Sequence, residues 1–194
     1  RKKDFWHLIR HSILTYTQEQ AGFTTSINEM VLECEMKPIT HAIIKKLHKD
    51  LVVISKDGKE IIADTGVKLQ QKTHQLYSGT IKFEDGSYRV IDTSKAEFIK
   101  EKFKGYKIGI FYKFVAELEM LKSVFENQLT TDLNEFNSSD KNIALQIVSG
   151  REGISLSKAD HLVFLNIDFS AVSYFQARDR LTTMERKENT IFWI

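Results

Sequence analysis

The segment Ser149–Ser155 has a composition suited to phosphate binding. It contains Gly150 and Gly153 and directly follows the apolar run Ile143–Val148, which we interpret as a buried strand. Open α/β sheets bind ligands in loops beyond the carboxyl ends of their strands, and exposed amides in such a loop can hold a phosphate. A tight turn would explain the same two glycines. The chain has no complete P-loop of the form Gly-x-x-x-x-Gly-Lys-Ser/Thr.

A second group, Gln176, Arg180 and Arg186, lies on a predicted helix and just beyond its end. Gln176 and Arg180 are four positions apart, so a helix would place them on one face. The guanidinium fork of arginine binds phosphate oxygens, and an arginine aimed at a transferring γ-phosphoryl group stabilises its charge. The alternative interpretation is a solvated helix in which Asp179 and Glu185 pair with neighbouring arginines.

Other reactive residue types form weaker patterns. His7 and His11 share a predicted helix face, but no carboxylate completes a ligand set, so we expect no metal ligands in this chain. Cys34 is the only cysteine, which excludes an internal disulfide. Nucleophilic Ser/His/Asp catalysis lacks the Gly-x-Ser-x-Gly elbow that would support it. The lysines between Lys95 and Lys107 alternate with glutamates, a pattern typical of a solvated helix face.

The elements expected from Ser94 onward alternate between helix and strand. Ser94 and Glu97 fit a capping box at a helix start, and apolar runs bounded by polar turns indicate strands buried on both faces. This pattern predicts an α/β fold with a mainly parallel sheet flanked by helices. The expected elements are helix 94–104, strand 107–112, helix 115–127, strand 143–148, strand 161–167, helix 171–181 and strand 190–194.

Residues 1–93 are predicted to form an N-terminal arm, mostly helical, packed on this sheet. Apolar residues at helical spacing indicate helices, whereas strict alternation indicates a strand with one wet face. The turn residues Glu84-Asp85-Gly86 indicate a small hairpin. The expected elements are a helix that ends before Gly22, a strand over 30–36, a helix over 38–47, a helix from Ile61 that ends near Gly79, and a hairpin over 80–92.

The composition is that of an ordinary folded chain of 194 residues. Lys and Arg number 28 against 26 Asp and Glu, a net charge of +2 that is too balanced to indicate a nucleic-acid partner by itself. No apolar run approaches the roughly 20 residues that span a bilayer, so we expect a cytoplasmic protein with no membrane partner. The chain starts at Arg1 and ends in an apolar Phe192-Trp193-Ile194, and we expect it to be part of a longer protein, truncated at its end.

Three segments, taken in order, resemble motifs of the second RecA-like domain of superfamily 2 helicases. The resemblance is to the chromatin-remodeller-like (Swi/Snf-type) DNA translocase branch, including its phage and bacterial members. Lys107–Leu121 resembles motif IV, Val148–Asp160 resembles motif V, and Tyr174–Arg180 resembles motif VI. The pair Ser94-Lys95 is similar to the Ser-Lys that often opens this domain, and the resemblance is looser upstream.

The resemblance implies that residues 94–194 are the RecA-like helicase C-terminal domain of an ATP-dependent DNA translocase, with residues 1–93 leading into it. It implies ATP with Mg²⁺ as the cofactor, in a cleft shared with the N-terminal RecA-like domain of the same polypeptide, which holds most of the metal contacts. Duplex DNA is the other implied partner, and a bacterial or phage-encoded source is expected. This chain alone is expected to be inactive because it lacks the N-terminal domain.

The motifs also imply roles for individual residues. Thr183 stands where motif VI has its second arginine, which leaves that contact to Arg186, and Ser155 replaces the usual Asn or Asp. The implied roles are catalysis for Arg180, Gln176 and Arg186; nucleotide binding for Gly153, Ser155, Gln176 and Arg180; and DNA binding for Lys113, Ser149, Gly150 and Arg151.

Two alternatives stay open. One is a non-catalytic nucleic-acid-binding or interaction module with a degenerate RecA-like fold, for which Thr183 is the motivating feature. The other is an unrelated α/β nucleotide-binding protein, which would require a strand order unlike that of RecA.

Overall fold

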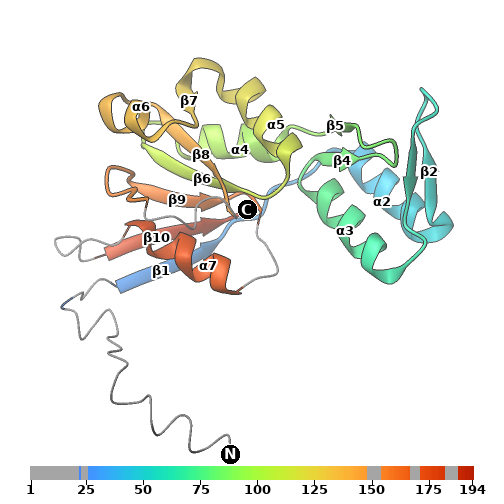
Figure 1. The fold of residues 1–194 in the computed structure, drawn as a ribbon, viewed down its shortest axis with the longest axis horizontal. Coiled ribbons are helices and arrows are strands. Elements are labelled where there is room, and N and C mark those ends of the chain that lie inside the picture. Colours follow the sequence, from blue (N-terminus) through green and yellow to red (C-terminus); the bar gives the residue numbers. More distant parts are fainter. Residues whose placement is uncertain (1–21, 23–25, 148–153, 167–170, 182–187) are drawn as a thin grey trace, which may run out of the picture.

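A six-stranded sheet forms the centre of the molecule, and every adjacent pair of its strands is parallel (Figure 1). The computed structural model describes residues 22, 26–147, 154–166, 171–181 and 188–194. The strand order β1-β10-β9-β6-β8-β7 confirms the predicted α/β class. The strands are β1 (Ser26–Val31), β6 (Ile108–Tyr112), β7 (Leu129–Thr130), β8 (Asn142–Gln146), β9 (His161–Phe164) and β10 (Glu188–Trp193).

The inner strand β6 is buried along its whole length. Ile108, Ile110 and Tyr112 pack with α4 (Ser94–Lys102) and α5 (Val115–Phe125) on one face of the sheet. Phe111 packs on the other face with α6 (Leu133–Ser138), α7 (Ala171–Arg178) and the segment 154–160. The sheet is therefore covered on both faces, as a continuous apolar strand requires.

Most predicted elements of this half are present, with shifted ends. The 3-10 turns η1 (Glu126–Gln128) and η3 (Asp179–Leu181) extend α5 and α7, and β9 ends three residues early. The predicted capping box on Ser94 is wrong, because the N-cap is Thr93, whose hydroxyl donates to Glu97 at 2.6 Å. Strand β7 and helix α6 were not predicted, since both are too short to show a period.

The strand predicted over 30–36 is wrong in its position. Pairing of β1 with β10 runs from Ser26 to Val31, and a last bond joins the Leu32 amide to the Trp193 carbonyl at 2.7 Å. Alternate exposure continues to Met36, which is buried, but this stretch has no strand partner among the described residues. Alternation reports one buried face of an extended chain, and it does not report whether a neighbouring strand continues.

Residues 38–92, here called the small unit, lie between β1 and α4 and pack around their own apolar cluster. In Figure 1 the small unit lies on the side toward which the strand arrows point. The predicted helix from Ile61 is wrong at its start, because Ile61 lies in a strand and the helix begins after its N-cap, Thr65. The elements are α2 (Pro38–Asp50), β2 (Val52–Ile54), β3 (Glu60–Ile62), α3 (Gly66–Tyr77), β4 (Thr80–Lys82) and β5 (Tyr88–Val90).

The expected helix over 38–47 and the hairpin over 80–92 are confirmed by α2 and by the pairing of β4 with β5. The helix expected before Gly22 lies outside the described residues. Division of the chain at Ser94 stays a prediction, although β1, which precedes that position, is part of the sheet. None of the helices in the described residues is long and apolar enough to cross a membrane.

A buried carboxylate joins the small unit to the six-stranded sheet with its covering helices, here called the sheet domain (β1 and residues 94–194). Asp92 is 1% exposed and accepts four hydrogen bonds. Two come from the start of α2, from the Lys37 amide at 2.7 Å and the Thr40 hydroxyl at 2.6 Å. The other two come from the amide and hydroxyl of Ser94 at the start of α4. Burial raises the pKa of Asp92, but the hydrogen bonds from Ser94 and Thr40 outweigh it and hold the pKa below its usual value.

We expect Asp92→Asn to lower the free energy of unfolding by roughly 2 to 3 kcal/mol near neutral pH, because an amide nitrogen cannot accept from these donors. The folded pKa of Asp92 is lowered, so its stabilisation is present above the unfolded pKa and is lost as pH falls through the folded value. The difference between the variant and the wild type should therefore shrink below about pH 4.

Urea unfolding across the acidic range measures this difference, with Asp140→Asn at an exposed aspartate as the control. A difference that stays constant with pH would contradict the role given to the Asp92 carboxylate.

Candidate functional site

Four of the predicted site residues lie in the described part of the chain: Lys113, Ser155, Gln176 and Arg180. The remaining predicted site residues, and Thr183 with them, lie outside the described residues: Ser149, Gly150, Arg151, Gly153 and Arg186.

Arg180 is bonded to the segment that resembles motif V. Its guanidinium Nη1 donates to the Ile154 carbonyl at 3.1 Å. Its own carbonyl accepts from the Leu156 amide at 3.0 Å. Ser155 lies between these two partners and is exposed. The described ends of two predicted site segments, far apart in sequence, are therefore in direct contact, here called the 154–180 contact.

Packing beneath this contact holds the segment 154–160 close to the sheet. Leu156 is fully buried, and Leu181 anchors the end of η3 in the same cluster. Gly109 of β6 allows this approach, because a Cβ there would lie 3.1 Å from Leu156 Cδ1 and 3.0 Å from Leu162 Cδ2. A larger residue at position 109 would push the segment that carries Ile154 away from β6.

Arg178 of α7 and Arg180 of η3 differ in their contacts, and each fits one of the two interpretations of this segment. Arg178 pairs with Asp179 at 3.2 Å and lies 3.8 Å from Glu29 of β1, as expected for a solvated helix. Arg180 is half-buried and donates to the main chain. Burial lowers the pKa of Arg180, and the neighbouring Asp179 carboxylate opposes that shift.

Gln176 is exposed on α7. The α-helix ends at Arg178, and Arg180 follows in a 3-10 turn. The four-residue spacing that aligns two side chains in an α-helix therefore does not extend to Arg180.

Lys113 lies at the carboxyl edge of the sheet, directly after β6. Its carbonyl accepts from the side-chain Nε2 of Gln146 at 3.0 Å, which ties the end of β6 to the end of β8. Its own amide donates to Glu117 at 2.7 Å. Lys113 is thus held at the carboxyl end of a strand, whereas Arg180 is held over a face of the sheet.

Sequence reasoning missed a polar cluster at this edge, between β6 and β9. Glu117 is fully buried, and its Oε2 accepts from the amides of Lys113 and Phe114. Its Oε1 accepts from Asn166 Nδ2 at 2.6 Å, and Asn166 Oδ1 is hydrogen-bonded to His74 Nε2. Burial raises the pKa of Glu117, while these hydrogen bonds oppose the shift. Glu117 could have been found as the third residue of a helix, where glutamate caps the start.

Two lysines of α4 are hydrogen-bonded to main-chain carbonyls, whereas a solvated helix face predicts lysines that point into water. Lys95 Nζ lies 2.9 Å from the Ile194 carbonyl and 3.5 Å from that of Leu165, and burial lowers the pKa of Lys95. Lys100 donates to the Val124 carbonyl at 2.7 Å near the end of α5. Both ammonium groups thus satisfy carbonyls at the ends of strands and helices.

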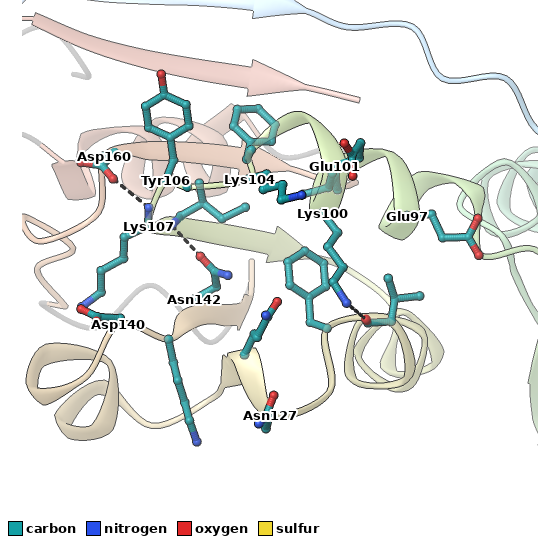
Figure 2. A pocket seen from close by; sticks show the side chains of 18 of the residues that line it. Glu97, Lys100, Glu101, Lys104, Tyr106, Lys107, Asn127, Asp140, Asn142 and Asp160 are labelled. Atoms are coloured by element: carbon teal, nitrogen blue, oxygen red, sulfur yellow. Dashed lines mark hydrogen bonds between the residues drawn. The ribbon is translucent and has the colours of Figure 1, made fainter.

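A cavity of about 1060 Å³ opens at the opposite, amino edge of the sheet (Figure 2). Lysines and acidic residues line it together, and the Lys107 amide is bonded to Asp160 at 2.7 Å. None of the four described site residues borders it. Within the described part of the chain, no three His, Cys, Asp or Glu side chains are grouped to hold a metal ion.

The fold is similar to that of known ATPase domains. The C-terminal part of the Fun30 ATPase domain superposes with a TM-score of 0.55 and 14% identity, over 89% of this chain and 86% of that one. The Sulfolobus solfataricus SWI2/SNF2 ATPase core domain gives 0.57 and 19%, over 100% of this chain and 45% of that one. The same core in complex with dsDNA gives 0.53 and 18%, over 100% and 47%.

The chain has the RecA-like fold of these ATPase domains. It spans less than half the length of the two Sulfolobus cores. No family profile and no curated protein sequence matches it. With identities below 20%, the likeness is one of fold.

We expect Gly109→Ala to lower the free energy of unfolding by about 1 to 2 kcal/mol, because its methyl group would crowd Leu156 and Leu162. Gly66→Ala is the matched control, since nothing lies within 4 Å of a Cβ at that position. That control should be neutral or slightly stabilising. Thermal unfolding of both variants measures the effect, and equal losses would contradict the close packing of 154–160 on β6.

Proposed function

We propose that the chain is the C-terminal RecA-like half of an ATP-dependent, helicase-like DNA translocase. In this proposal it supplies the motif V and VI side of a composite ATP site and part of the DNA-binding surface. The observation that carries the proposal is the 154–180 contact, because it joins the segments that resemble motifs V and VI. The RecA-like fold shared with Swi2/Snf2 ATPase cores supports it.

The residues of this face have chemistry that fits a triphosphate. The Ile154 carbonyl would orient the half-buried Arg180 guanidinium, so that little reorganisation is needed when charge develops. Gln176 and Arg186 would face the same phosphate, with Gly153 and Ser155 contacting the nucleotide. ATP with Mg²⁺, when bound, supplies the γ-phosphoryl group for hydrolysis. The metal would be held mainly by the N-terminal RecA-like domain of a longer polypeptide.

DNA is the second partner in this proposal. Lys113 would contact the phosphate backbone at the carboxyl edge of β6, together with the predicted residues Ser149, Gly150 and Arg151. The Gln146–Lys113 bond supports this grouping, because it ties the end of β6 to the end of β8, which precedes those three residues. Duplex DNA is the form we propose, and one structural neighbour is itself a complex with dsDNA. We further propose a bacterial or phage-encoded, cytoplasmic protein.

One structural feature favours the second candidate, a non-catalytic nucleic-acid-binding or interaction module. The Arg180 guanidinium donates to a main-chain carbonyl of its own domain, and Thr183 occupies the place of the other motif VI arginine. An arginine retained for such an internal bond needs no nucleotide. This candidate requires DNA binding without ATP turnover.

The central residue test is Arg180→Ala in the full-length protein. An arginine that stabilises charge in the transition state contributes roughly 10³ to 10⁵ in rate, so turnover should collapse while DNA affinity stays nearly unchanged. Arg180→Lys should restore little, because an ammonium group does not reproduce the guanidinium fork. Steady-state ATPase kinetics and a DNA-binding titration measure the two effects.

The control is Arg89→Ala, which removes an arginine of the small unit that pairs with Asp57. It should leave turnover nearly normal. Arg186→Ala and Thr183→Arg test which residue supplies the second motif VI contact, with a loss expected for the former and a gain for the latter. Near-normal turnover in Arg180→Ala would refute the motif VI assignment.

The isolated chain should bind ATP weakly and should not hydrolyse it. Half of a composite site lacks the groups that position the triphosphate and neutralise its charge. A phosphate-release assay on purified residues 1–194, with and without duplex DNA, measures this. Hydrolysis stimulated by DNA would mean that the ATP site is assembled differently.

A further inference from the structure

The carboxyl ends of β6 and β9 flank the point where the chain reverses its direction across the sheet. From β6 the chain passes through α5 to β7 on one face, whereas from β9 it passes through α7 to β10 on the other. Such a switch point is the usual ligand crevice of an open α/β sheet. Here the side chains of Glu117, Asn166 and His74 meet at this point.

Hydrogen bonding sets the direction of each group in this cluster. Both oxygens of Glu117 accept bonds, two from main-chain amides and one from Asn166 Nδ2. The amide oxygen of Asn166 is therefore left to face His74, whose Nε2 must carry the hydrogen. Asn166 is 7% exposed and Glu117 is fully buried, so an exchanged donor or acceptor would not be compensated by solvent.

Each of the three side chains belongs to a different part of the structure. Glu117 is in the first turn of α5, and His74 is in the last turn of α3 in the small unit. Asn166 follows β9, and Lys95 Nζ lies 3.5 Å from the carbonyl of the preceding residue, Leu165. The exit of β9 is thus bonded to the sheet domain and to the small unit together.

Helix α7 packs on β9 and β10 through one large side chain, Tyr174, whose ring centroid lies 5.6 Å from that of Phe164 and 4.7 Å from that of Trp193. It has eight residues, and the ones it buries, Ser173 and Ala177, are small. Its larger apolar side chains Val172 and Phe175 are 64% and 48% exposed. Small buried residues contribute little apolar area, so the place of this helix depends strongly on the contact of Tyr174 with Phe164, the last residue of β9. The 154–180 contact holds the far end.

We propose that His74, Asn166 and Glu117 form a positioning relay through which the small unit sets where α7, and with it Arg180, lies. This inference rests on the proposed function, because a phosphate-facing Arg180 requires that α7 be placed accurately. His74, Asn166 and Glu117 are positioning residues in this proposal, acting through α7 and touching neither nucleotide nor DNA.

A polarity exchange tests the bonds of the relay without any ATP chemistry. Asn166→Asp puts two carboxylates face to face, and Glu117→Gln puts two amide nitrogens face to face. The double variant restores one donor and one acceptor in reversed order. We expect each single variant to lower Tm by roughly 5 to 10 °C and the double variant to return to within about 3 °C of the wild type.

Thermal unfolding of residues 1–194 measures this exchange. Asn127→Asp makes the same chemical change at an exposed asparagine and should leave Tm unchanged. Losses that simply add in the double variant would overturn the relay.

Turnover by the full-length protein tests whether the relay acts on α7. His74→Leu removes the donor, whereas His74→Gln keeps an amide hydrogen near the Nε2 position. At a temperature where all variants are folded, His74→Leu should lower kcat roughly tenfold, with KM for ATP and Kd for DNA changed less than about threefold. His74→Gln should recover most of kcat.

A merely structural role would leave kcat of folded His74→Leu equal to that of the wild type, and that result would overturn the proposal. Absence of turnover in the wild type would instead contradict the proposed function. The polarity exchange would then still decide whether the relay bonds exist.

Discussion

Burial of β6 on both faces is the constraint on which the rest of the structure depends. A strand without a solvent face needs crossovers above and below it, so α4 and α5 cover one face while 154–160 and α7 cover the other. Because the crossovers leave β6 and β9 on opposite faces, the chain must reverse direction between these strands. Gly109 adds to this constraint, since its missing side chain lets 154–160 lie directly on β6.

The same arrangement links the 154–180 contact to the polar cluster of Glu117, Asn166 and His74. The segment 154–160 contacts Arg180 in η3, directly after α7, and Asn166, which follows β9, contacts Glu117 and His74. The short helix α7 lies between these features, and its Tyr174 packs on Phe164 at the end of β9. The small unit, which is joined to the sheet domain through Asp92 as well, becomes part of the same framework.

Local sequence patterns predicted the elements that have a clear period of their own. Apolar runs predicted β6, β8 and β9, and Pro38 together with helical spacing predicted α2. Short elements such as β2, β7 and α6 were missed because two to six residues carry no period. The strand near Met30 was displaced because alternation continues past the last residue of the partner strand.

The site was predictable only where it follows a motif. Arg180 and Ser155 were named from their segments, but their closeness depends on Leu156 and Gly109, which belong to different elements and have no shared local pattern. The contact between His74 and Asn166 joins residues 92 positions apart, which no spacing rule covers. Lys95 was assigned to a solvated face because a helical charge run does not show which strand ends lie beside it.

ATP turnover by the full-length protein, measured without and with duplex DNA, tests most directly whether this domain is half of an ATP-driven DNA motor. We predict steady turnover that rises when duplex DNA is added. The full-length protein carries both halves of the proposed ATP site, and duplex DNA is the partner along which the proposed translocase moves. DNA binding with no turnover under either condition would contradict this conclusion and would favour the non-catalytic module.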